Sequence, residues 1–447
     1  MKSTNVLIIG GSAAGLSTAN SVKTWHPNKS VTVVRDVAYT VVPCGIPYIY
    51  GTLKAVEKDK IPDEGFLKKG IEIVVSKVSS IDRSQHLVTL ADGETISYEK
   101  LVLATGARPV VPNIPGAQLE NIFPIYKDPD YLQHLDDVLQ HNKKVVVIGG
   151  GFIGVEMAEQ IRLKGDAYNV TLIEALPHCL AVACEEEYGQ KIEMELEQMG
   201  IKVMTNTLVE AFTGQQKVEG VVLKGGGSIA ADIVILGIGT LPNIALASQA
   251  GLQVDEKEGM IVDEYLRTSD PDIFACGDCA SKFSSINGQP VIIRLASVAA
   301  SEGLIAASNL FQLNRKSPGA LGAFATKVGN TAVGAAGFTE RMCQEDNIDY
   351  YVGKMVSPDR HPASLPGCTM QTEVKLLFDR RDDRIIGGHV LGGVQAADMV
   401  NILALAIQQK LTAAELAIMQ YATHPLLTGS PLVYQVMWAA ENAIAKK

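Results

Sequence analysis

Short runs of apolar residues recur along the first half of the chain, and each ends in small residues or a turn. Six of these runs, rich in Val, Ile and Leu, are apolar or nearly apolar throughout; they span residues 6–9, 31–34, 101–103, 145–148, 170–173 and 233–236. Continuous runs of this kind are typical of parallel strands that are covered on both faces. Helix-like segments follow two of them, at residues 16–23 and 155–163. The pattern predicts an α/β fold built from two similar units.

The pattern changes after residue 324. Strand-like alternation appears in residues 326–338 and 372–378, and a charged turn follows at residues 379–383. Residues 396–409 have helical spacing, and on spacing alone their apolar face is a core face. That face consists of Met399, Val400, Leu403, Ala406 and Ile407. The sequence therefore predicts a third, α+β region after the two α/β units.

Length and composition support several domains and a cytoplasmic setting. A chain of 447 residues with 47% hydrophobic residues is too long for one core. Its net charge of −10 gives no general attraction to nucleic acid or to an anionic membrane. No apolar run reaches the ~18 residues that a membrane span needs, and we expect no export signal. Seven cysteines without framework spacing fit reduced thiols in the cytoplasm.

The first apolar run leads into a turn of small residues. The turn contains Gly10, Ser12, Ala13, Ala14 and Gly15, and a helix-like segment follows. A strand, tight turn and helix of this kind seats a pyrophosphate on the helix N-terminus, where unpaired N–H groups and the helix dipole favour anions. Serine replaces the middle glycine of the Gly-x-Gly-x-x-Gly pattern, and it is small enough for that position. Taken alone, the turn fits a nucleotide site or an ordinary strand-turn-helix.

The same pattern occurs a second time, and there it is complete. The run at residues 145–148 is followed by Gly149, Gly151, Phe152, Ile153 and Gly154 in the Gly-x-Gly-x-x-Gly arrangement. A repeated fingerprint is harder to explain by chance than a single one. We therefore expect two dinucleotide sites in one chain.

The residues that end the second strand of each unit differ. Twenty residues after Gly154, Glu174 ends a strand, and an acid there accepts hydrogen bonds from a ribose 2′-OH and repels a 2′-phosphate. This favours NADH over NADPH. Twenty residues after Gly15, the equivalent place holds Arg35, and Asp36 follows. The acid expected at the first site is thus displaced by one residue.

The later strands of both units also correspond. The run at residues 101–103 ends in Ala104, Thr105 and Gly106, and the run at residues 233–236 ends in Gly237, with Gly239 two positions later. Small residues at strand ends let the backbone approach a nucleotide closely. Either end alone could be an ordinary strand-to-loop junction, but two at matching offsets support nucleotide binding.

A final motif, Gly277-Asp278 between Cys276 and Cys279, completes a family resemblance. Over essentially all 447 residues the chain resembles the pyridine nucleotide-disulfide oxidoreductases. In that family the first fingerprint and the Ala-Thr-Gly segment bind FAD, and the second fingerprint binds NAD(P)H. The resemblance implies that Asp278 bonds the ribityl chain of FAD and that Gly277 allows close approach. Because no second cysteine pair or histidine cluster accompanies the Cys-x-x-Cys spacing, we expect no metal.

The resemblance also implies a domain plan. It gives an FAD-binding domain of residues 1–112 and 250–324, an NADH-binding domain of residues 113–249, and a C-terminal dimerisation domain of residues 325–447. In the family this third domain forms a homodimer and lends residues to the partner's active site. Glu156 matches a family glutamate near the nicotinamide; the alternative is an exposed helix residue.

Cys44 is the candidate redox residue. It lies just past the second strand of the first unit, and disulfide-containing relatives carry a second cysteine five residues further on, where this chain has Ile49. The chain therefore resembles the single-cysteine branch, which includes coenzyme A disulfide reductases, NADH oxidases and peroxidases, and NADH-dependent persulfide or sulfur reductases. Pro47 and Gly51 fit a short helix after Cys44, whose N-terminus would lower the pKa of the thiol. The alternative is a buried structural thiol.

Other cysteines and charged groups have simpler interpretations. Cys179, Cys184, Cys343 and Cys368 lack ligand spacing, and we expect core or incidental thiols. Residues 54–69 hold five lysines and four acids. We expect this run to form a solvated surface; the alternative is that its lysines bind the phosphates of coenzyme A.

The proton donor is less clear from the sequence. In two-cysteine relatives a His-Pro-Thr segment followed by a glutamate protonates the leaving thiolate from the partner chain. Here the resemblance assigns this role to His424, without the glutamate; otherwise His424 is a packed interface histidine. Tyr421 is a weaker candidate. Coenzyme A disulfide reductases also carry a tyrosine pair that residues 361–367 lack. His361 and Arg360 are then further candidates for proton delivery, and the alternative is that this stretch is a solvated loop.

These observations give one leading hypothesis and two rivals. In the leading one, electrons pass from NADH through FAD to Cys44, whose thiolate attacks the S–S bond of coenzyme A persulfide, polysulfide or coenzyme A disulfide. The substrate supplies the second sulfur. One rival is an NADH oxidase or peroxidase in which Cys44 cycles through a sulfenic acid. The other is a non-catalytic flavoprotein redox sensor.

Overall fold

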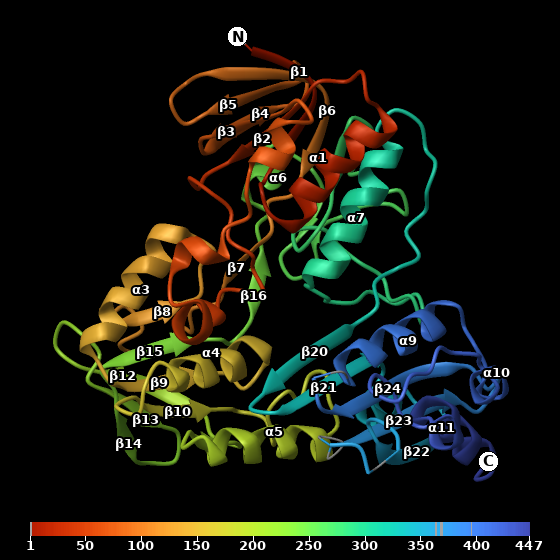
Figure 1. Cartoon of the computed structure of the whole chain (residues 1–447). Helices are drawn as coiled ribbons and strands as arrows, with labels where there is room; N and C mark the ends of the chain where they lie inside the picture. The colour runs from red at the N-terminus through yellow and green to blue at the C-terminus, as the bar shows by residue number, and fades with distance from the viewer. Residues whose placement is uncertain (1, 363, 367–369, 395) are drawn as a thin grey trace. The chain divides into compact units, whose positions relative to one another are not determined.

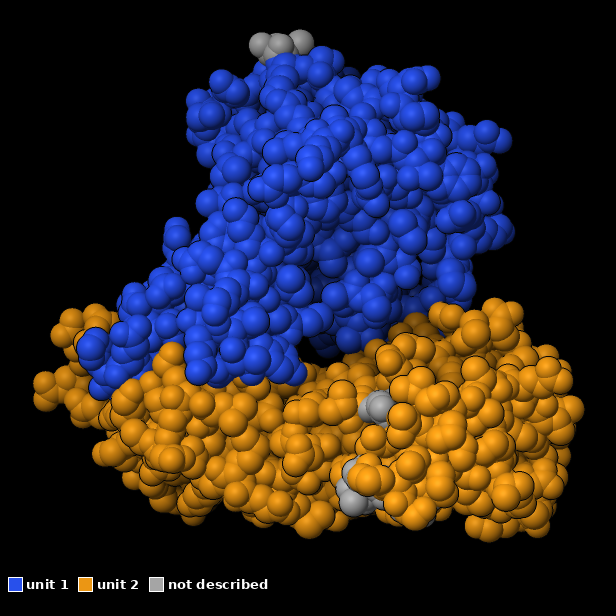
Figure 2. Space-filling view, in the orientation of Figure 1, with its two compact units in different colours: residues 1–113, 123–142, 238–320 blue, residues 114–122, 143–237, 321–447 orange. Residues whose placement is uncertain are grey.

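The computed structural model describes residues 2–362, 364–366, 370–394 and 396–447. The chain forms two compact units (Figure 2). Unit 1 holds residues 1–113, 123–142 and 238–320, and unit 2 holds residues 114–122, 143–237 and 321–447. The first passage from unit 1 to unit 2 falls beside the boundary predicted at residues 112 and 113. Most of the predicted NADH domain shares unit 2 with the predicted C-terminal domain.

A seven-stranded sheet forms the centre of unit 1 (Figure 1). The strand order is β3-β2-β1-β6-β5-β4, and β19 pairs with β6. The parallel strands are β1 (Lys2–Ile9), β2 (Val31–Arg35), β3 (Ile71–Val75), β6 (Thr95–Leu103) and β19 (Ile273–Ala275). β4 (Val78–Asp82) and β5 (Leu87–Leu90) form an antiparallel hairpin that joins the first residues of β6.

Both faces of this sheet are covered, which explains the unbroken apolar runs in the sequence. Helices α1 (Ala13–Trp25) and α7 (Ala296–Asn309) pack together, and Ser17 Oγ of α1 donates a 2.8 Å hydrogen bond to the carbonyl of Ala300 in α7. Val6 and Ile8 belong to the core cluster that contains residues of both helices. Leu7, between them in the strand, belongs to the cluster of the opposite face.

The rest of unit 1 consists of one longer helix, α3 (Pro129–His141), and several short elements. η1 (Ile49–Leu53) and η2 (Val56–Asp59) follow Cys44, and then come α2 (Glu64–Leu67) and α3. β7 (Ala107–Pro109) pairs antiparallel with β16 (Thr240–Pro242), and β17 (Val254–Asp255) with β18 (Gly259–Met260). α6 (Ala245–Gln249) lies between these pairs in the sequence. Within β8 (Ile122–Pro124) the chain passes from unit 2 to unit 1.

The first half of unit 2 is a second parallel sheet. Its neighbouring strands are β11 (Lys202–Met204), β10 (Asn169–Ile173), β9 (Lys144–Ile148) and β15 (Ile233–Leu236). Its helices are α4 (Phe152–Leu163) and α5 (Glu186–Gln198). An antiparallel sheet of β12 (Val209–Thr213), β13 (Gly220–Leu223) and β14 (Ser228–Ala230) shares a core with it. The prediction of two Rossmann-like units is confirmed.

The C-terminal part of unit 2 is the predicted α+β region. Its antiparallel sheet has the order β20 (Ala323–Val328), β21 (Thr331–Gly337), β24 (Ile385–Gly392), β23 (Gln371–Asp379) and β22 (Tyr350–Pro358). The predicted run 326–338 divides into two strands at Gly329, whose φ of 56° makes a tight turn. The helical elements are α8 (Glu340–Glu345), α9 (Ala396–Gln408), α10 (Ala413–Ala417), η3 (Pro431–Val433) and α11 (Gln435–Ile444). The predicted core face of α9 is confirmed for Val400, Leu403, Ala406 and Ile407, whereas Met399 is half-buried.

Candidate active site

The turn between β1 and α1 has no room for larger residues. A Cβ atom at Gly10, where φ is 115°, would lie 2.1 Å from the carbonyl oxygen of Ala104. One at Gly15 would lie 1.8 Å from the carbonyl oxygen of Gly10. Ser12 is the N-cap of α1, and its side chain makes no cap hydrogen bond. The first-turn N–H groups, including those of Ala13 and Ala14, therefore form the anion-favouring end of a helix.

The end of the second strand departs from the family's usual acid. Arg35 is 4% exposed, and its guanidinium makes two hydrogen bonds to the carboxylate of Asp63, of 2.7 and 2.6 Å. It also donates to the carbonyl of Ala38. A Cβ atom at Gly11 would lie 2.9 Å from Arg35 Cβ and Cδ, so Arg35 packs directly against the first fingerprint. Asp36 is exposed. The contact of Asp36 with an FAD ribose stays a prediction. No motif in the sequence indicated that Asp63 pairs with Arg35.

The Ala104, Thr105 and Gly106 segment is fixed by a residue far away in sequence. Thr105 Oγ1 donates a 2.8 Å hydrogen bond to the carbonyl of Asn243, and Asn243 Nδ2 returns one of 2.8 Å to the carbonyl of Thr105. The N–H of Asn243 bonds the carbonyl of Gly106, whose φ is 68°. Ala104 donates to Ile9 at the end of β1. The segment thus lies beside the first fingerprint, and its contact with FAD stays a prediction.

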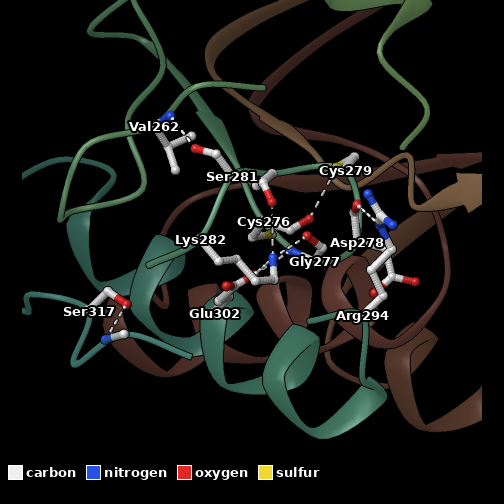
Figure 3. Close-up of polar contacts among 12 residues, drawn as sticks. Val262, Cys276, Gly277, Asp278, Cys279, Ser281, Lys282, Arg294, Glu302 and Ser317 are labelled. Atoms are coloured by element: carbon white, nitrogen blue, oxygen red, sulfur yellow. Dashed lines mark hydrogen bonds and ion pairs between the residues drawn. The ribbon is translucent and has the colours of Figure 1, made fainter. Parts of the chain in front are cut away.

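The Gly277-Asp278 turn is held from below by a buried ion pair (Figure 3). Lys282 Nζ lies 3.0 Å from Glu302 Oε2 and donates a 2.7 Å hydrogen bond to the carbonyl of Gly277. Glu302 Oε2 also accepts a 2.7 Å bond from the N–H of Gly277. A Cβ at Gly277 would lie 2.8 Å from Ala14 Cβ, so the turn touches α1. Burial raises the pKa of Glu302, and Lys282 opposes this rise.

The side chain of Asp278 faces positive charge. Lys127 Nζ lies 3.6 Å from Asp278 Oδ2, and Arg294 donates to the carbonyl of Asp278. The flanking Cys276 and Cys279 are fully buried, and burial raises the pKa of both thiols. They are therefore neutral core thiols. No group of three or more His, Cys, Asp or Glu residues that could hold a metal occurs in the described part of the chain.

Cys44 lies on an exposed turn before η1. Gly45 donates to Val42, Tyr48 donates to Gly45, and five residues beyond Cys44 the side chain of Ile49 is buried. A short helix does follow Cys44, but η1 begins only at Ile49, so the predicted effect of its N-terminus on the thiol stays a prediction. Gly51 lies inside η1, and the left-handed C-cap residue is Lys54, with a φ of 61°. The alternative of a buried thiol is wrong.

Asp59 lies behind the Cys44 turn. Its carbonyl accepts a 2.8 Å hydrogen bond from Val42, and a Cβ atom at Gly45 would lie 1.8 Å from Asp59 Oδ1. The side chain is buried, and Oδ2 has no hydrogen-bond partner within the described structure. Burial raises the pKa of Asp59 to about 6. Nothing in the sequence singled it out among the charged residues of the 54–69 run.

The second fingerprint in unit 2 has the geometry of the first. Gly149 has a φ of 103°, and a Cβ atom at Gly154 would lie 1.7 Å from its carbonyl oxygen. Gly151 caps α4 without a side-chain bond, which leaves the helix N-terminus at Phe152 and Ile153 available to an anion. Gly237 ends β15 nearby: its added Cβ atom would lie 3.3 Å from the N atom of Gly154. Gly239, with a φ of 105°, belongs to unit 1.

Two acids accompany this fingerprint. Glu174 follows β10 and accepts hydrogen bonds from the N–H groups of Gly150 and Leu176. Its position at the fingerprint agrees with a ribose contact, which stays a prediction. Glu156 on α4 is 9% exposed, so the alternative of an exposed helix residue is wrong. Burial raises its pKa to about 7, although a 2.7 Å bond from Thr326 Oγ1 opposes the shift.

His424 belongs to unit 2, in an exposed loop. Its Nδ1 accepts a hydrogen bond from the N–H of Leu426, which places the proton of the neutral ring on Nε2. His361 supports this loop: its N–H donates to Pro425, and its Nδ1 lies 3.0 Å from the carbonyl of Thr428. Cys368 and residues 363 and 367 lie outside the described residues.

Comparison with known proteins identifies the family. The model of the pyridine nucleotide-disulphide oxidoreductase family matches residues 4–303, and that of its dimerisation domain matches residues 324–432. The chain belongs to this family. It is accordingly an NAD(P)H-dependent oxidoreductase, and FAD and NAD(P)H are its cofactors.

The names of the relatives include two activities that bear on the site. An NADH oxidase of Methanocaldococcus jannaschii is 30% identical over 98% of both chains. An NAD(P)H coenzyme A polysulfide/persulfide reductase of Pyrococcus horikoshii is 32% identical over 87% of both. Among solved structures, an NAD-dependent persulfide reductase from A. fulgidus superposes with a TM-score of 0.90 at 31% identity, covering 99% of this chain and 83% of that one.

Proposed function

We propose that this enzyme carries electrons from NADH through FAD to the S–S bond of coenzyme A persulfide, polysulfide or coenzyme A disulfide, with Cys44 as the residue that attacks sulfur. The observation that carries the proposal is the exposure of Cys44 on its turn. The other cysteines within the described residues are buried, and burial raises the pKa of each; they are Cys179, Cys184, Cys276, Cys279 and Cys343. A large substrate such as coenzyme A disulfide can therefore reach Cys44 but not the buried cysteines.

The glycines of each unit supply the cofactor sites. In unit 1 the α1 N-terminus would bind the pyrophosphate of FAD, Ala104 to Gly106 would face the flavin nucleotide, and Asp278 would bond its ribityl chain. In unit 2 the α4 N-terminus would bind the pyrophosphate of NADH, and Glu174 would face its ribose. FAD, when bound, accepts a hydride from NADH and passes two electrons to sulfur.

The thiol chemistry follows from a single exposed cysteine. The Cys44 thiolate attacks one sulfur of the substrate, the S–S bond breaks, and a mixed disulfide or a Cys44 persulfide forms. Because Ile49 occupies the place of a second cysteine, the motif itself offers no second thiol to resolve this product. Its sulfur bond is reduced by the electron pair from NADH, which releases a thiol or hydrosulfide and restores Cys44.

Lysines near Cys44 fit an anionic acceptor. Lys54, Lys58 and Lys60 are exposed on the segment that follows the Cys44 turn. Cations there would attract the phosphates of coenzyme A. The Pyrococcus horikoshii relative, named for coenzyme A polysulfide and persulfide, supports this class of acceptor.

The C-terminal region supports a homodimer. Residues 324–432 match a dimerisation domain. Large apolar side chains stand exposed there and need a cover; they include Leu405, Ile418, Leu426, Leu427 and Leu432. Since His424 lies in the same stretch, the partner subunit would cover this loop, and His424 would reach the partner's active site to give a proton to the leaving thiolate. A cytoplasmic location also stays a prediction.

The second candidate function is an NADH oxidase or peroxidase, in which peroxide oxidises the Cys44 thiolate to a sulfenic acid. The Methanocaldococcus jannaschii relative, which matches 98% of the chain, favours it. The redox-sensor alternative lacks such support, because the relatives named above are enzymes.

Trapping of the Cys44 intermediate separates these functions. The reduced holoenzyme is mixed anaerobically with coenzyme A disulfide, coenzyme A persulfide or peroxide, without NADH, and the Cys44 peptide is weighed by mass spectrometry. We expect a coenzyme A mixed disulfide or a persulfide at Cys44 with the sulfur compounds. Trapping of a sulfenic acid with peroxide, and no adduct with any sulfur compound, would favour the second function. Cys343→Ala, at a buried thiol, is the control.

A further inference from the structure

A loop that follows Glu174 lines the second fingerprint. It spans residues 175–185 and leads into α5. Glu174 accepts a hydrogen bond from the N–H of Gly150, and Leu180, with a φ of 59°, donates a 2.8 Å hydrogen bond to the carbonyl of Gly150. A Cβ atom at Gly150 would lie 3.1 Å from the sulfur of Cys179. The loop therefore forms a wall of the site in which the NADH ribose would lie.

The far end of this loop is held by the C-terminal region of the same unit. Arg341 of α8 donates a 3.0 Å hydrogen bond to the carbonyl of Ala181. The N–H of Glu340, also in α8, donates a 2.8 Å hydrogen bond to Glu185 Oε1. The position of the loop thus depends on a region that lies far from the fingerprint in sequence.

A buried lysine lies where these segments meet. Lys375 of β23 is 1% exposed. Its Nζ forms an ion pair with Glu340 and lies 3.3 Å from Glu187 Oε1 and 3.7 Å from Glu185 Oε1. Glu185 is the N-cap of α5 and Glu187 lies in its first turn, whereas Glu340 belongs to α8. A single buried cation therefore joins carboxylates from both sides of the junction.

Within the described part of the chain, the neighbouring basic groups cannot replace Lys375. His389 pairs with Lys375 in the sheet register and is 1% exposed; burial, and then the charge of Lys375, lower its pKa to about 3, so the ring is neutral. Lys354 contacts Glu187 as well, but its side chain is exposed. Loss of the buried cation would leave like charges side by side at the junction, which is unfavourable at a site shielded from water.

We propose that Lys375 is a positioning residue for the nicotinamide nucleotide: it joins α8 to the start of α5, holds the loop of residues 175–185 against Gly150, and so sets the affinity of the second fingerprint for NADH. The proposal rests on the function proposed above, in which this fingerprint binds NADH. The loop faces the adenosine ribose, and the reacting nicotinamide ring lies at the other end of the dinucleotide. Loss of Lys375 should therefore weaken binding and leave the rate at saturation unchanged.

The test is equilibrium binding of NAD⁺ to the oxidised holoenzyme by isothermal titration calorimetry, since NAD⁺ does not reduce the flavin. Lys375→Met keeps a long side chain and removes its charge. We expect the Kd for NAD⁺ to rise about tenfold. Stopped-flow reduction of the flavin by NADH should show a similar rise in the half-saturating concentration, with the same limiting rate. Wild-type affinity for NAD⁺, or a lower limiting rate at unchanged half-saturation, would overturn the proposal.

Lys354→Met is the matched control. It removes an exposed cation that contacts the same Glu187, and it should leave NAD⁺ binding unchanged. An equal loss of affinity would assign the effect to net charge and would overturn the role of Lys375. Glu174→Gln tests the NADH site itself, and wild-type affinity there would contradict the placement of NADH. Weaker binding in Glu174→Gln beside wild-type binding in Lys375→Met would contradict only the role of Lys375.

Arg341→Ala decides the question if Lys375→Met lacks a cooperative thermal unfolding transition. The side chain of Arg341 is half exposed, so its removal leaves no buried charge. The variant loses the hydrogen bond to Ala181 and should also bind NAD⁺ more weakly, at an unchanged limiting rate of flavin reduction. NAD⁺ affinity equal to that of the wild type would then overturn the proposal. No measurement here uses a sulfur acceptor, so the sulfur reductase function can stand if the role of Lys375 fails.

Discussion

Glu156 and Thr326, which lie 170 residues apart in sequence, are joined by a hydrogen bond of 2.7 Å from Thr326 Oγ1 to Glu156 Oε1. The bond ties helix α4 of the nucleotide fingerprint to β20, the first strand of the C-terminal sheet. Glu156 is nevertheless buried enough that its pKa rises to about 7. A carboxyl group with this pKa changes its charge in the range where the enzyme would work.

Replacement of Glu156 by Gln should change the pH dependence of stability. Because the pKa is raised in the folded state, Glu156 stabilises the fold below its ordinary value of 4.5, and this contribution is lost as pH rises to about 7. Glu156→Gln should therefore raise the free energy of unfolding in urea more at pH 8 than at pH 5, by up to about 3 kcal/mol. Glu210→Gln, at an exposed position of β12, should show no such difference. Equal effects at both pH values would contradict the burial argument.

The Arg35–Asp63 pair should be required for the first nucleotide unit. Asp63→Asn leaves the buried guanidinium of Arg35 without its carboxylate, and the loss of these charged hydrogen bonds should cost about 2 kcal/mol. Since Arg35 packs against Gly11, FAD should also bind more weakly. Urea unfolding and FAD titration of the apoprotein measure the two effects. Glu64→Gln, at the exposed carboxylate next to Asp63, is the control. If both variants behave alike, the pair has no special role.

The Lys282–Glu302 pair should govern how firmly FAD is retained. In Lys282→Met the carboxyl of Glu302 loses the cation that lowers its pKa, so this pKa rises further. At a pH above it, Glu302 carries a buried negative charge without a partner beneath the Gly277 turn. Loss of FAD, followed by the fluorescence of released flavin, should speed up as pH rises. The double variant with Glu302→Gln should lose FAD without this pH dependence. If the pH dependence persists there, another group controls the turn.

A methyl group at Gly45 should disturb the Cys44 turn. In Gly45→Ala the added atom meets Asp59 Oδ1, and overpacking of this kind costs about 1–3 kcal/mol. The double variant with Asp59→Ala should recover most of the lost stability in thermal unfolding. Gly65→Ala, where the new atom enters open space, serves as the control. No rescue in the double variant would mean that Gly45 is needed for another reason.

The sequence predicted those parts of the fold whose signals are local. Buried parallel strands appear in the sequence as unbroken apolar runs. Glycine is required at Gly10 and Gly154 because a Cβ atom at either position would collide with the backbone of the turn. The helix after Cys44 was predicted from Pro47 and Gly51. The end of this helix was not predicted, because the residue in the left-handed conformation is Lys54, and lysine is not a residue type that indicates a turn.

The parts that sequence reasoning missed depend on tertiary contacts. Asp63 lies in a run of mixed charges, and only the fold shows that it pairs with Arg35. Asn243, which bonds Thr105, belongs to no recognisable motif. Asp59 looked as solvated as its neighbours. Burial is decided by which segments cover a residue, and the local pattern of a mixed-charge segment does not contain that information.

Consumption of NADH is the measurement that decides whether the enzyme reduces sulfur. It is followed anaerobically with coenzyme A persulfide, polysulfide, coenzyme A disulfide and peroxide, and separately in air. Wild type is compared with Cys44→Ser and with Cys343→Ala. The proposed sulfur reductase function predicts turnover on at least one sulfur acceptor that is lost in Cys44→Ser and kept in Cys343→Ala. Consumption of NADH with peroxide or oxygen only, while all sulfur acceptors stay inert, would contradict it.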